Sequence, residues 1–185
     1  MLTAGFKLDK CRGFTLVEIV MALLILGILA GVGLPSLRDF IERNRIKTSA
    51  ESLQNAIQLA RGEALRLNQK VRFTLGVGTA WSVNVDAGGA VVQQSRASGE
   101  GGSADVGSAT NPAGATQITF NGLGRVVDNT TPGLATLTAI DVSIAGAPVE
   151  TIRRIEISSP GGQVRICIPP PTIPVAGIDP RRCLQ

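Results

Sequence analysis

The segment from Phe14 to Leu34 constrains the fold of this chain more than any other feature. It is an unbroken run of mainly apolar residues, and Glu18 carries its only charge. At about 1.5 Å per residue, a helix of this length spans roughly 30 Å, which is the thickness of a bilayer's hydrocarbon core. A charged side chain inside such a segment costs at least about 2.5 kcal/mol, so Glu18 needs a partner or a function there.

A basic leader precedes the apolar run. Lys7, Lys10 and Arg12 lie before it, and the positive-inside rule then predicts a cytoplasmic leader and a C-terminal bulk outside, which in a bacterium is the periplasm. A secretory signal peptide is one alternative, but its apolar region is shorter and lacks an interrupting carboxylate. An ordinary membrane anchor is a second alternative, and it explains the length of the run without explaining Glu18.

An amphipathic pattern follows Pro35. A proline inside a helix removes one hydrogen bond and bends the axis. Beyond it, apolar residues recur at alternating steps of four and three, which predicts one long helix with a single apolar stripe that ends near Asn68. The small alanines in the stripe favour packing under a β-sheet over a coiled-coil seam. The stripe consists of Ile46, Ala50, Leu53, Ile57, Ala60, Ala64 and Leu67.

The rest of the chain reads as short strands separated by turns. Residues 71–77 and 81–85 alternate around Gly78-Thr79 and predict a β-hairpin. Further strand patterns occur near Val91 and Val92, Ile118 and Phe120, Leu137 to Ile144, Ile155 and Ile157, and Val164 to Ile168. Residues 97–115 are rich in Gly, Ala, Ser and Asn, which predicts a long surface loop. One long helix followed by these strands predicts an α+β fold with a largely antiparallel sheet.

The junction Gly13-Phe14-Thr15-Leu16-Val17-Glu18 resembles the type III signal of type IV pilins and type II secretion pseudopilins. The resemblance implies that a prepilin peptidase cuts after Gly13 and methylates the new amine of Phe14. It also implies that Glu18 neutralises the N-terminal amine of a neighbouring subunit during assembly. Pro35 occupies the place of a proline that curves the helix in these proteins without ending it.

Three further segments resemble the GspH/FimT family of minor pilins. Ala60-Arg61-Gly62-Glu63-Ala64-Leu65 is similar to its helix segment ARSEA, Trp81-Ser82-Val83 to its second strand, and Ile118 to Arg125 to its "tFnglGr" turn. Gly62 departs from the usual serine and costs the helix roughly 1 kcal/mol relative to alanine. With the N-terminus, the resemblance covers most of residues 10–168 and implies a type IV pilin-like fold.

The resemblance also implies a domain organisation. Residues 1–13 form the prepilin leader, 14–37 the transmembrane segment, 38–68 the amphipathic helix, and 69–185 a periplasmic β-rich domain. Cys11 then leaves with the leader, and an oxidising compartment favours a disulfide between Cys167 and Cys183 over two free thiols. Two cysteines without any histidine leave a zinc site short of ligands, so we expect no metal.

Filament assembly is the function that the resemblance implies. Its partners are other major or minor pilins or pseudopilins, the prepilin peptidase and the inner membrane, and the role is initiation or tip assembly of a type IV pilus. A GspH-like pseudopilin of type II secretion is an alternative. The chain has no histidine, no phosphate-binding loop and no paired carboxylates with an evident purpose, so we expect neither an enzyme nor a cofactor.

DNA binding is the remaining alternative. FimT-like members linked to transformation carry Gly-Arg-x-Arg before a C-terminal cysteine, and this chain has Gly162-Gln163-Val164-Arg165 there. Gln163 replaces the first arginine, and a disulfide at Cys183 would bring Arg181 and Arg182 towards Arg165. Phosphate binding depends on such accumulated cations. Alternatively, these arginines are ordinary solvated or salt-bridged surface residues, and the net charge of +4, part of which lies in the leader, does not indicate a nucleic-acid partner.

Overall fold

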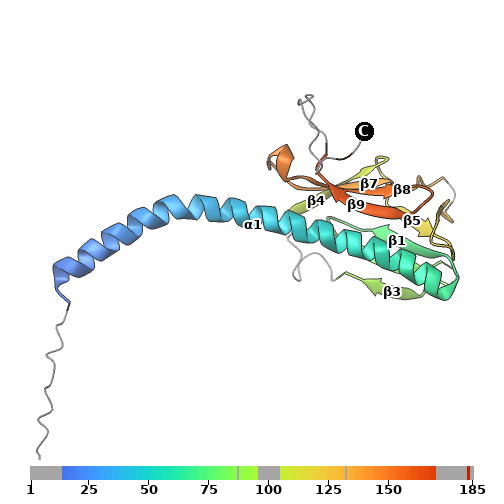
Figure 1. The fold of residues 1–185 in the computed structure, drawn as a ribbon, viewed down its shortest axis with the longest axis horizontal. Coiled ribbons are helices and arrows are strands. Elements are labelled where there is room, and N and C mark those ends of the chain that lie inside the picture. The colour runs from blue at the N-terminus through green and yellow to red at the C-terminus, as the bar shows by residue number, and fades with distance from the viewer. Residues whose placement is uncertain (1–13, 87, 96–104, 132, 170–182, 184–185) are drawn as a thin grey trace, which may run out of the picture. The chain divides into compact units, whose positions relative to one another are not determined.

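The structure is a computed structural model that describes residues 14–86, 88–95, 105–131, 133–169 and 183. The side chains of residues 32–36 are outside this description as well. The chain divides into two compact units, Met1–Phe40 and Ile41–Gln185. Helix α1, which Figure 1 labels, begins in the first unit and ends in the second.

Helix α1 comprises the 52 residues Leu16–Leu67, and local sequence signals define both of its ends. The Glu18 N–H donates to Thr15 Oγ1 at 3.2 Å, so Thr15 is the N-cap. At the other end Asn68 has a φ of 50°, and the Gln69 N–H donates to the Ala64 carbonyl at 3.3 Å, which is a Schellman cap. The helix therefore ends at Leu67, next to Asn68 as predicted, and it continues through Pro35.

The predicted apolar stripe is the face of α1 that is buried in the second unit. Ile46, Ala50, Leu53, Ile57, Ala60 and Ala64 are each at most 1% exposed, and Leu67 is partly buried against them. They belong to one core cluster with residues of the strands, among them Phe73, Phe120 and Ile155. Packing of the helix against β-structure is thus confirmed.

The strands form two antiparallel sheets where the sequence pattern suggested one. The first sheet has the order β3 (Val91–Gln94), β2 (Trp81–Val85), β1 (Val71–Leu75), β5 (Gln117–Phe120) and β6 (Val126–Val127). The second has the order β4 (Val106–Asn111), β7 (Ala139–Ile144), β8 (Arg153–Ser158) and β9 (Gln163–Cys167). A 3₁₀ turn, η1 (Val149–Thr151), precedes β8.

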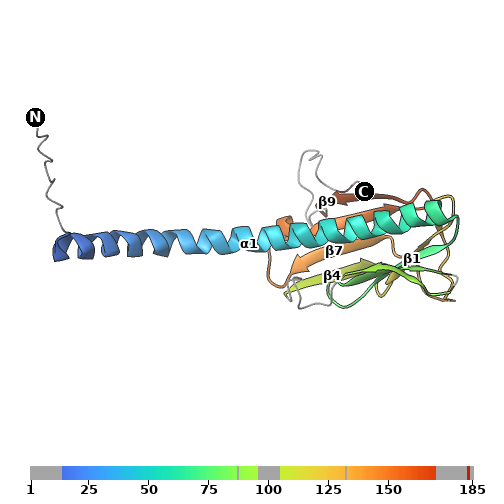
Figure 2. The same cartoon turned by 90° about the horizontal axis from the view of Figure 1, so that it is seen from below.

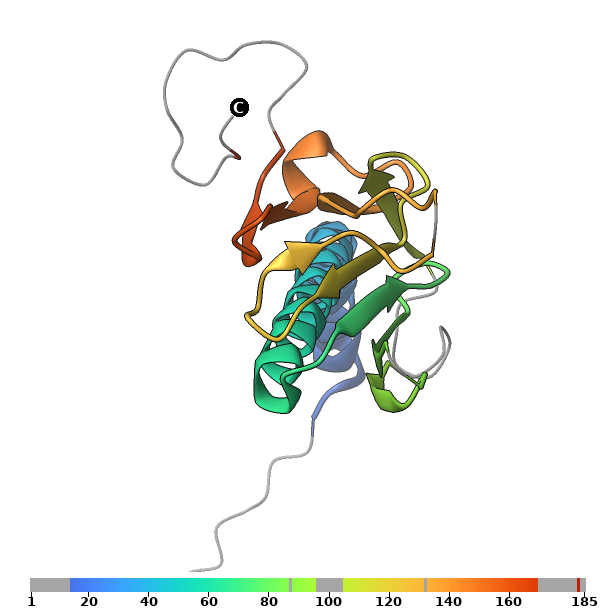
Figure 3. The ribbon, with the colours of Figure 1, turned by 90° about the vertical axis from the view of Figure 1, so that its right-hand side faces the viewer.

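Both sheets pack on the C-terminal part of α1. Figure 2 shows this part of the helix running alongside the strands, and Figure 3 shows it end-on with strands on more than one side. Phe73 of β1 and Ile118 of β5 contribute to the core from the first sheet, and Ile140 and Ile155 contribute from the second. The fold is therefore the expected α+β arrangement of one long helix with largely antiparallel sheet.

The prediction of a surface loop over residues 97–115 is wrong for its second half. Residues 106–111 form β4, which pairs with β7 at every position, and Ala115 is only 1% exposed. Of the β4 residues only Val106 is buried, so the strand carries no alternating apolar pattern. Its formation depends on hydrogen bonding to β7, a long-range contact that local composition does not encode. Residues 97–104 lie outside the described part of the chain.

The hairpin prediction is confirmed except at one end. Strands β1 and β2 pair from Val71–Val85 to Leu75–Trp81, with Gly78 at a φ of 66° in the turn. Val77, which the alternation placed in the first strand, is instead 87% exposed in the turn.

Among the described residues, no helix meets the combined requirement of length and hydropathy for a membrane span.

Candidate functional site

The first turn of α1 contains the residues that the sequence singled out for processing and assembly. Phe14 is 78% exposed, and Glu18 lies in the first turn, where the helix dipole favours a carboxylate. Thr15 and Glu18 also occupy the N-cap and N3 positions of a capping-box sequence. Glu18 therefore has a local role in starting the helix in addition to any role between subunits. Gly13 lies outside the described residues.

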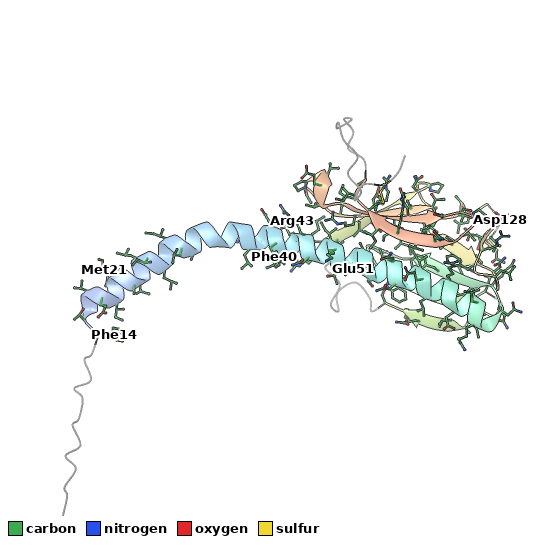
Figure 4. The ribbon with its side chains drawn as sticks, viewed as in Figure 1. Phe14, Met21, Phe40, Arg43, Glu51 and Asp128 are labelled. Atoms are coloured by element: carbon green, nitrogen blue, oxygen red, sulfur yellow. A yellow bond between two sulfur atoms is a disulfide. The ribbon has the colours of Figure 1, made fainter. Side chains whose placement is uncertain are left out.

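Apart from Glu18, the N-terminal part of α1 presents apolar side chains around its whole circumference. Phe14, just before the helix, and Met21, within it, are labelled in Figure 4, and Met21 is 59% exposed. A helix that is apolar all round is normally buried in a core or in a membrane. Its large exposed residues are Leu16, Val17, Ile19, Val20, Met21, Leu23, Leu24, Ile25, Leu26, Ile28 and Leu29. This surface needs an apolar environment that the described chain does not supply.

Two of the family-like segments contact each other. Arg61 of the ARGEA segment donates from Nε to the carbonyl oxygen of Gly124 in the turn after β5, at 3.1 Å. Asn121 stabilises that turn, because its Oδ1 accepts from the N–H groups of Leu123 and Arg125, each at 3.0 Å. These two segments, which lie far apart in the sequence, thus form one joint between helix and sheet.

Glycines in this joint are required by close approach. A Cβ on Gly122 would lie 2.3 Å from Asn68 Oδ1 at the helix cap. Gly124 has a φ of +70°, and a Cβ there would lie 3.2 Å from Arg61 Nε. The turn therefore supports the end of α1, and its residues have a structural explanation without any ligand.

The segment that resembles a DNA-binding motif also begins with a packing glycine. Gly162 has a φ of +67°, and a Cβ there would lie 2.8 Å from the Gly124 carbonyl oxygen and 3.0 Å from Phe120 Cε1. Gly162 is buried in the turn between β8 and β9. This turn of the second sheet thus packs directly on the first sheet.

Arg165 is ion-paired within the second sheet. Its Nε lies 2.8 Å from Glu156 Oε2, and Glu156 is its direct cross-strand neighbour in β8. Next to it, Arg154 binds Asp141 of β7 through two hydrogen bonds, each of 2.7 Å. The hydrogen bond to Asp141 raises the pKa of Arg154 above its ordinary value, in spite of partial desolvation. Arg165 therefore matches the alternative of a salt-bridged surface residue.

Arg181 and Arg182 lie outside the described residues. The disulfide beside them is formed as predicted: Cys167 and Cys183 are bonded, their Cα atoms are 5.1 Å apart, and the Cys183 N–H donates to the Ile168 carbonyl at 3.0 Å. Glu156 lies within 4.8 Å of both sulfurs. Because metal binding needs thiolates, the oxidised pair does not form a metal site with Glu156.

One polar cluster was not predicted from the sequence. Asp86, with 6% of its side chain exposed, pairs with Arg72 of β1 and accepts from Thr130 Oγ1. Burial raises the pKa of Asp86, but the hydrogen bonds from Thr130 and Arg72 outweigh burial and lower the pKa below its ordinary value. The cluster connects the first hairpin to the segment after β6 and stabilises the fold.

The comparison with known families agrees with this architecture. Residues 8–34 match the prokaryotic N-terminal methylation motif. The chain therefore falls in the class of proteins with a pilin-type N-terminus. Residues 49–168, most of the second unit, match the model of type II transport protein GspH. The chain belongs to this GspH family of pilins and pseudopilins, whose known role is structural.

The fold is also similar to that of a protein of known structure. Two crystal forms of the type IV minor pilin FimU from Pseudomonas aeruginosa resemble the chain. One is 23% identical, covers 69% of this chain and 91% of its own, and has a TM-score of 0.53. The other is 20% identical, covers 65% and 90% respectively, and has a TM-score of 0.46. No curated protein sequence matches the chain.

Proposed function

We propose that this chain is a minor pilin that contributes to initiation or tip assembly of a type IV pilus. The observation that carries the proposal is the order of its parts: a methylation-type N-terminus, then a helix segment that is apolar all round, then a GspH domain. The type IV minor pilin FimU shares the fold. Prepilin peptidase would cut after Gly13 and methylate Phe14.

The apolar segment of α1 would hold the chain in the inner membrane before assembly, with residues 69–185 in the periplasm. In the filament, the same side chains would be covered by the helices of neighbouring pilins. Glu18 would then meet the N-terminal amine of an adjacent subunit, which compensates the cost of a carboxylate in an apolar setting. Such an interaction is heterologous and does not close on itself, as a helical filament requires.

Processing after Gly13 is the first point to test. We expect Gly13→Val to block cleavage in cells that contain the peptidase, so that mass spectrometry finds the leader still attached. Gly5→Val, within the leader but away from the junction, serves as the control and should be processed normally. A mature chain that begins at Phe14 in the Gly13 variant would refute the proposed processing.

Assembly through Glu18 is the second point. We expect Glu18→Ala to reduce the amount of this chain in sheared filaments without changing its level in the membrane fraction. Glu42→Ala changes an exposed carboxylate on the same helix and provides the matched control. Equal incorporation of the Glu18 variant and the wild type would exclude the proposed role of Glu18.

The type II secretion pseudopilus is the second candidate, because the matched family model carries the name of its GspH component. A deletion strain distinguishes the two: loss of surface pili with intact protein secretion supports the pilus, and the reverse result supports the pseudopilus. DNA binding has weaker support, because Arg165 forms an ion pair with Glu156 and Gln163 replaces the first arginine of the Gly-Arg-x-Arg motif.

A further inference from the structure

A groove lies between α1 and the edge of the first sheet, within the second unit. Its volume is about 510 Å³, in the range of roughly 300–1,000 Å³ that small-molecule sites occupy. Helix α1 contributes Glu51, labelled in Figure 4, together with Ser52 and Asn55, and the sheet contributes Trp81 and Gln93.

The groove exists because α1 does not cover the edge strand β3. Gln93 pairs with Val83, so both side chains lie on the same face of the sheet, and Val83 is completely buried there. Gln93 is nevertheless exposed, so the helix-facing side of β3 is open at this residue. A polar residue thus stands at a position where the neighbouring strands place core residues.

Trp81 is held in a fixed position at this groove. Its indole Nε1–H donates to Ser52 Oγ on α1 at 3.2 Å. Its backbone N–H donates to Ser95 Oγ at 2.8 Å, and its carbonyl accepts from the Ser95 N–H at 2.9 Å. The indole is only partly buried, so a rigid aromatic surface borders the open groove.

The polar groups beside Trp81 are available to a ligand. The side-chain amides of Asn55 and Gln93 form no hydrogen bond with any described residue, and each can both donate and accept. Glu51 is the acidic side chain among the residues that line the groove, and its only ion pair in the described chain is a 3.8 Å contact with Lys47. A lining with a carboxylate and no cation disfavours phosphates and nucleic acids.

We propose that this groove binds a neutral carbohydrate. A pyranose ring presents C–H groups on its face and hydroxyl groups around its rim. This matches an aromatic surface bordered by a carboxylate and by two amides that bind no described residue. One ring would stack on Trp81, and its hydroxyl or N-acetyl groups would bond to Asn55 and Gln93. Two sources supply this chemistry, N-acetylated cell-wall glycan and unmodified glucan, and a site here is compatible with either filament type.

Intrinsic fluorescence offers a direct assay, because Trp81 is the only tryptophan and the chain has no tyrosine. The full-length protein in detergent is titrated with two neutral series, β-1,4-linked N-acetylglucosamine oligomers and cello-oligosaccharides. We expect a saturable change in emission with at least one of them. N-acetylated ligands that bind better than cello-oligosaccharides would identify the cell wall as the source, and the reverse order would identify glucan.

Gln93 and Gln94 provide a matched pair of variants. They are exposed neighbours on β3 whose side chains lie on opposite faces of the sheet. We expect Gln93→Ala and Asn55→Ala each to weaken binding about 2- to 12-fold, the loss of one neutral hydrogen bond, and Gln94→Ala to leave it unchanged. Thermal unfolding of each variant confirms that the fold is intact.

Three results would overturn the proposal. The first is no change in emission with any saccharide up to about 10 mM, a range that detects even dissociation constants near 1 mM. The second is binding that Gln93→Ala and Gln94→Ala affect equally, which would place the ligand elsewhere. The third is a response to a purified partner pilin in the absence of any response to saccharide, which would make the groove a protein interface.

Discussion

Gly162→Ala tests the joint between the two sheets. The Gly162 backbone has a φ of +67°, and an added Cβ would lie 2.8 Å from the Gly124 carbonyl oxygen. The neighbouring Gly161 has no such constraint, because a Cβ there meets no atom within 4 Å. The two glycines therefore form a matched pair in the turn between β8 and β9.

The expected magnitude follows from two contributions. Holding an alanine in the left-handed region costs roughly 1–2 kcal/mol. Making room against the Gly124 backbone and the Phe120 ring costs about 1–3 kcal/mol more, as in other overpacked sites. We therefore expect Gly162→Ala to lower the free energy of unfolding by about 2–5 kcal/mol, a large part of the 5–15 kcal/mol that is typical of a domain. Gly161→Ala should change it by less than about 0.5 kcal/mol.

Urea unfolding of the full-length chain in mild detergent, followed by Trp81 fluorescence, measures both variants. The Gly162 variant should unfold at a lower urea concentration with an unchanged slope of free energy against denaturant. Equal midpoints for the two variants would refute the structural explanation of Gly162. In that case the glycine of the Gly-Gln-Val-Arg segment would have to be explained by a ligand and not by packing.

Three further substitutions test separate features. Gly62→Ala should stabilise the protein by about 0.5–1 kcal/mol, because a Cβ there meets no atom within 4 Å and alanine favours the helix; urea unfolding measures the gain. The folded state lowers the pKa of Asp86, so the stability from this group is present above about pH 4 and is lost as the pH falls through the folded pKa. Asp86→Asn should therefore remove this part of the acid dependence, which melting curves at pH 7, 5 and 3 measure. Cys183→Ser, whose disulfide partner is 16 residues away, should cost about 3 kcal/mol relative to the oxidised protein and nothing relative to the reduced protein.

The helix and the first hairpin were predictable because their signals are local. The stripe from Ile46 to Leu67 has the helical period, Asn68 is an accepted residue for the left-handed cap, and Val71 to Leu75 alternates in burial as a half-buried strand does. These signals involve residues close in the sequence. They can therefore be recognised without knowledge of the tertiary structure.

The features that were missed depend on pairing over long distances. Strand β4 has one buried residue and is defined by its ladder with β7, and the division into two sheets follows from which strands pair. The Asp86 cluster requires Arg72 and Thr130 to meet across different elements. The prediction of a DNA-binding site was limited in the same way. The sequence around Arg165 does not show that Glu156 lies next to it in the sheet.

The register of the second sheet decides which arginines are paired with a carboxylate and which could bind a phosphate. Arg154 and Arg165 lie on one face of the second sheet, and the register places Asp141 and Glu156 directly opposite them. A phosphate that approaches Arg165 must therefore displace Glu156 or bind beside it, and the Glu156 carboxylate repels the phosphate. The number of arginines in the sequence does not show this cost. DNA binding at this face would need cations from outside the described residues, such as Arg181 and Arg182, to outweigh these pairs. The same face without them is close to neutral, which suits contact with another protein subunit better than contact with a polyanion.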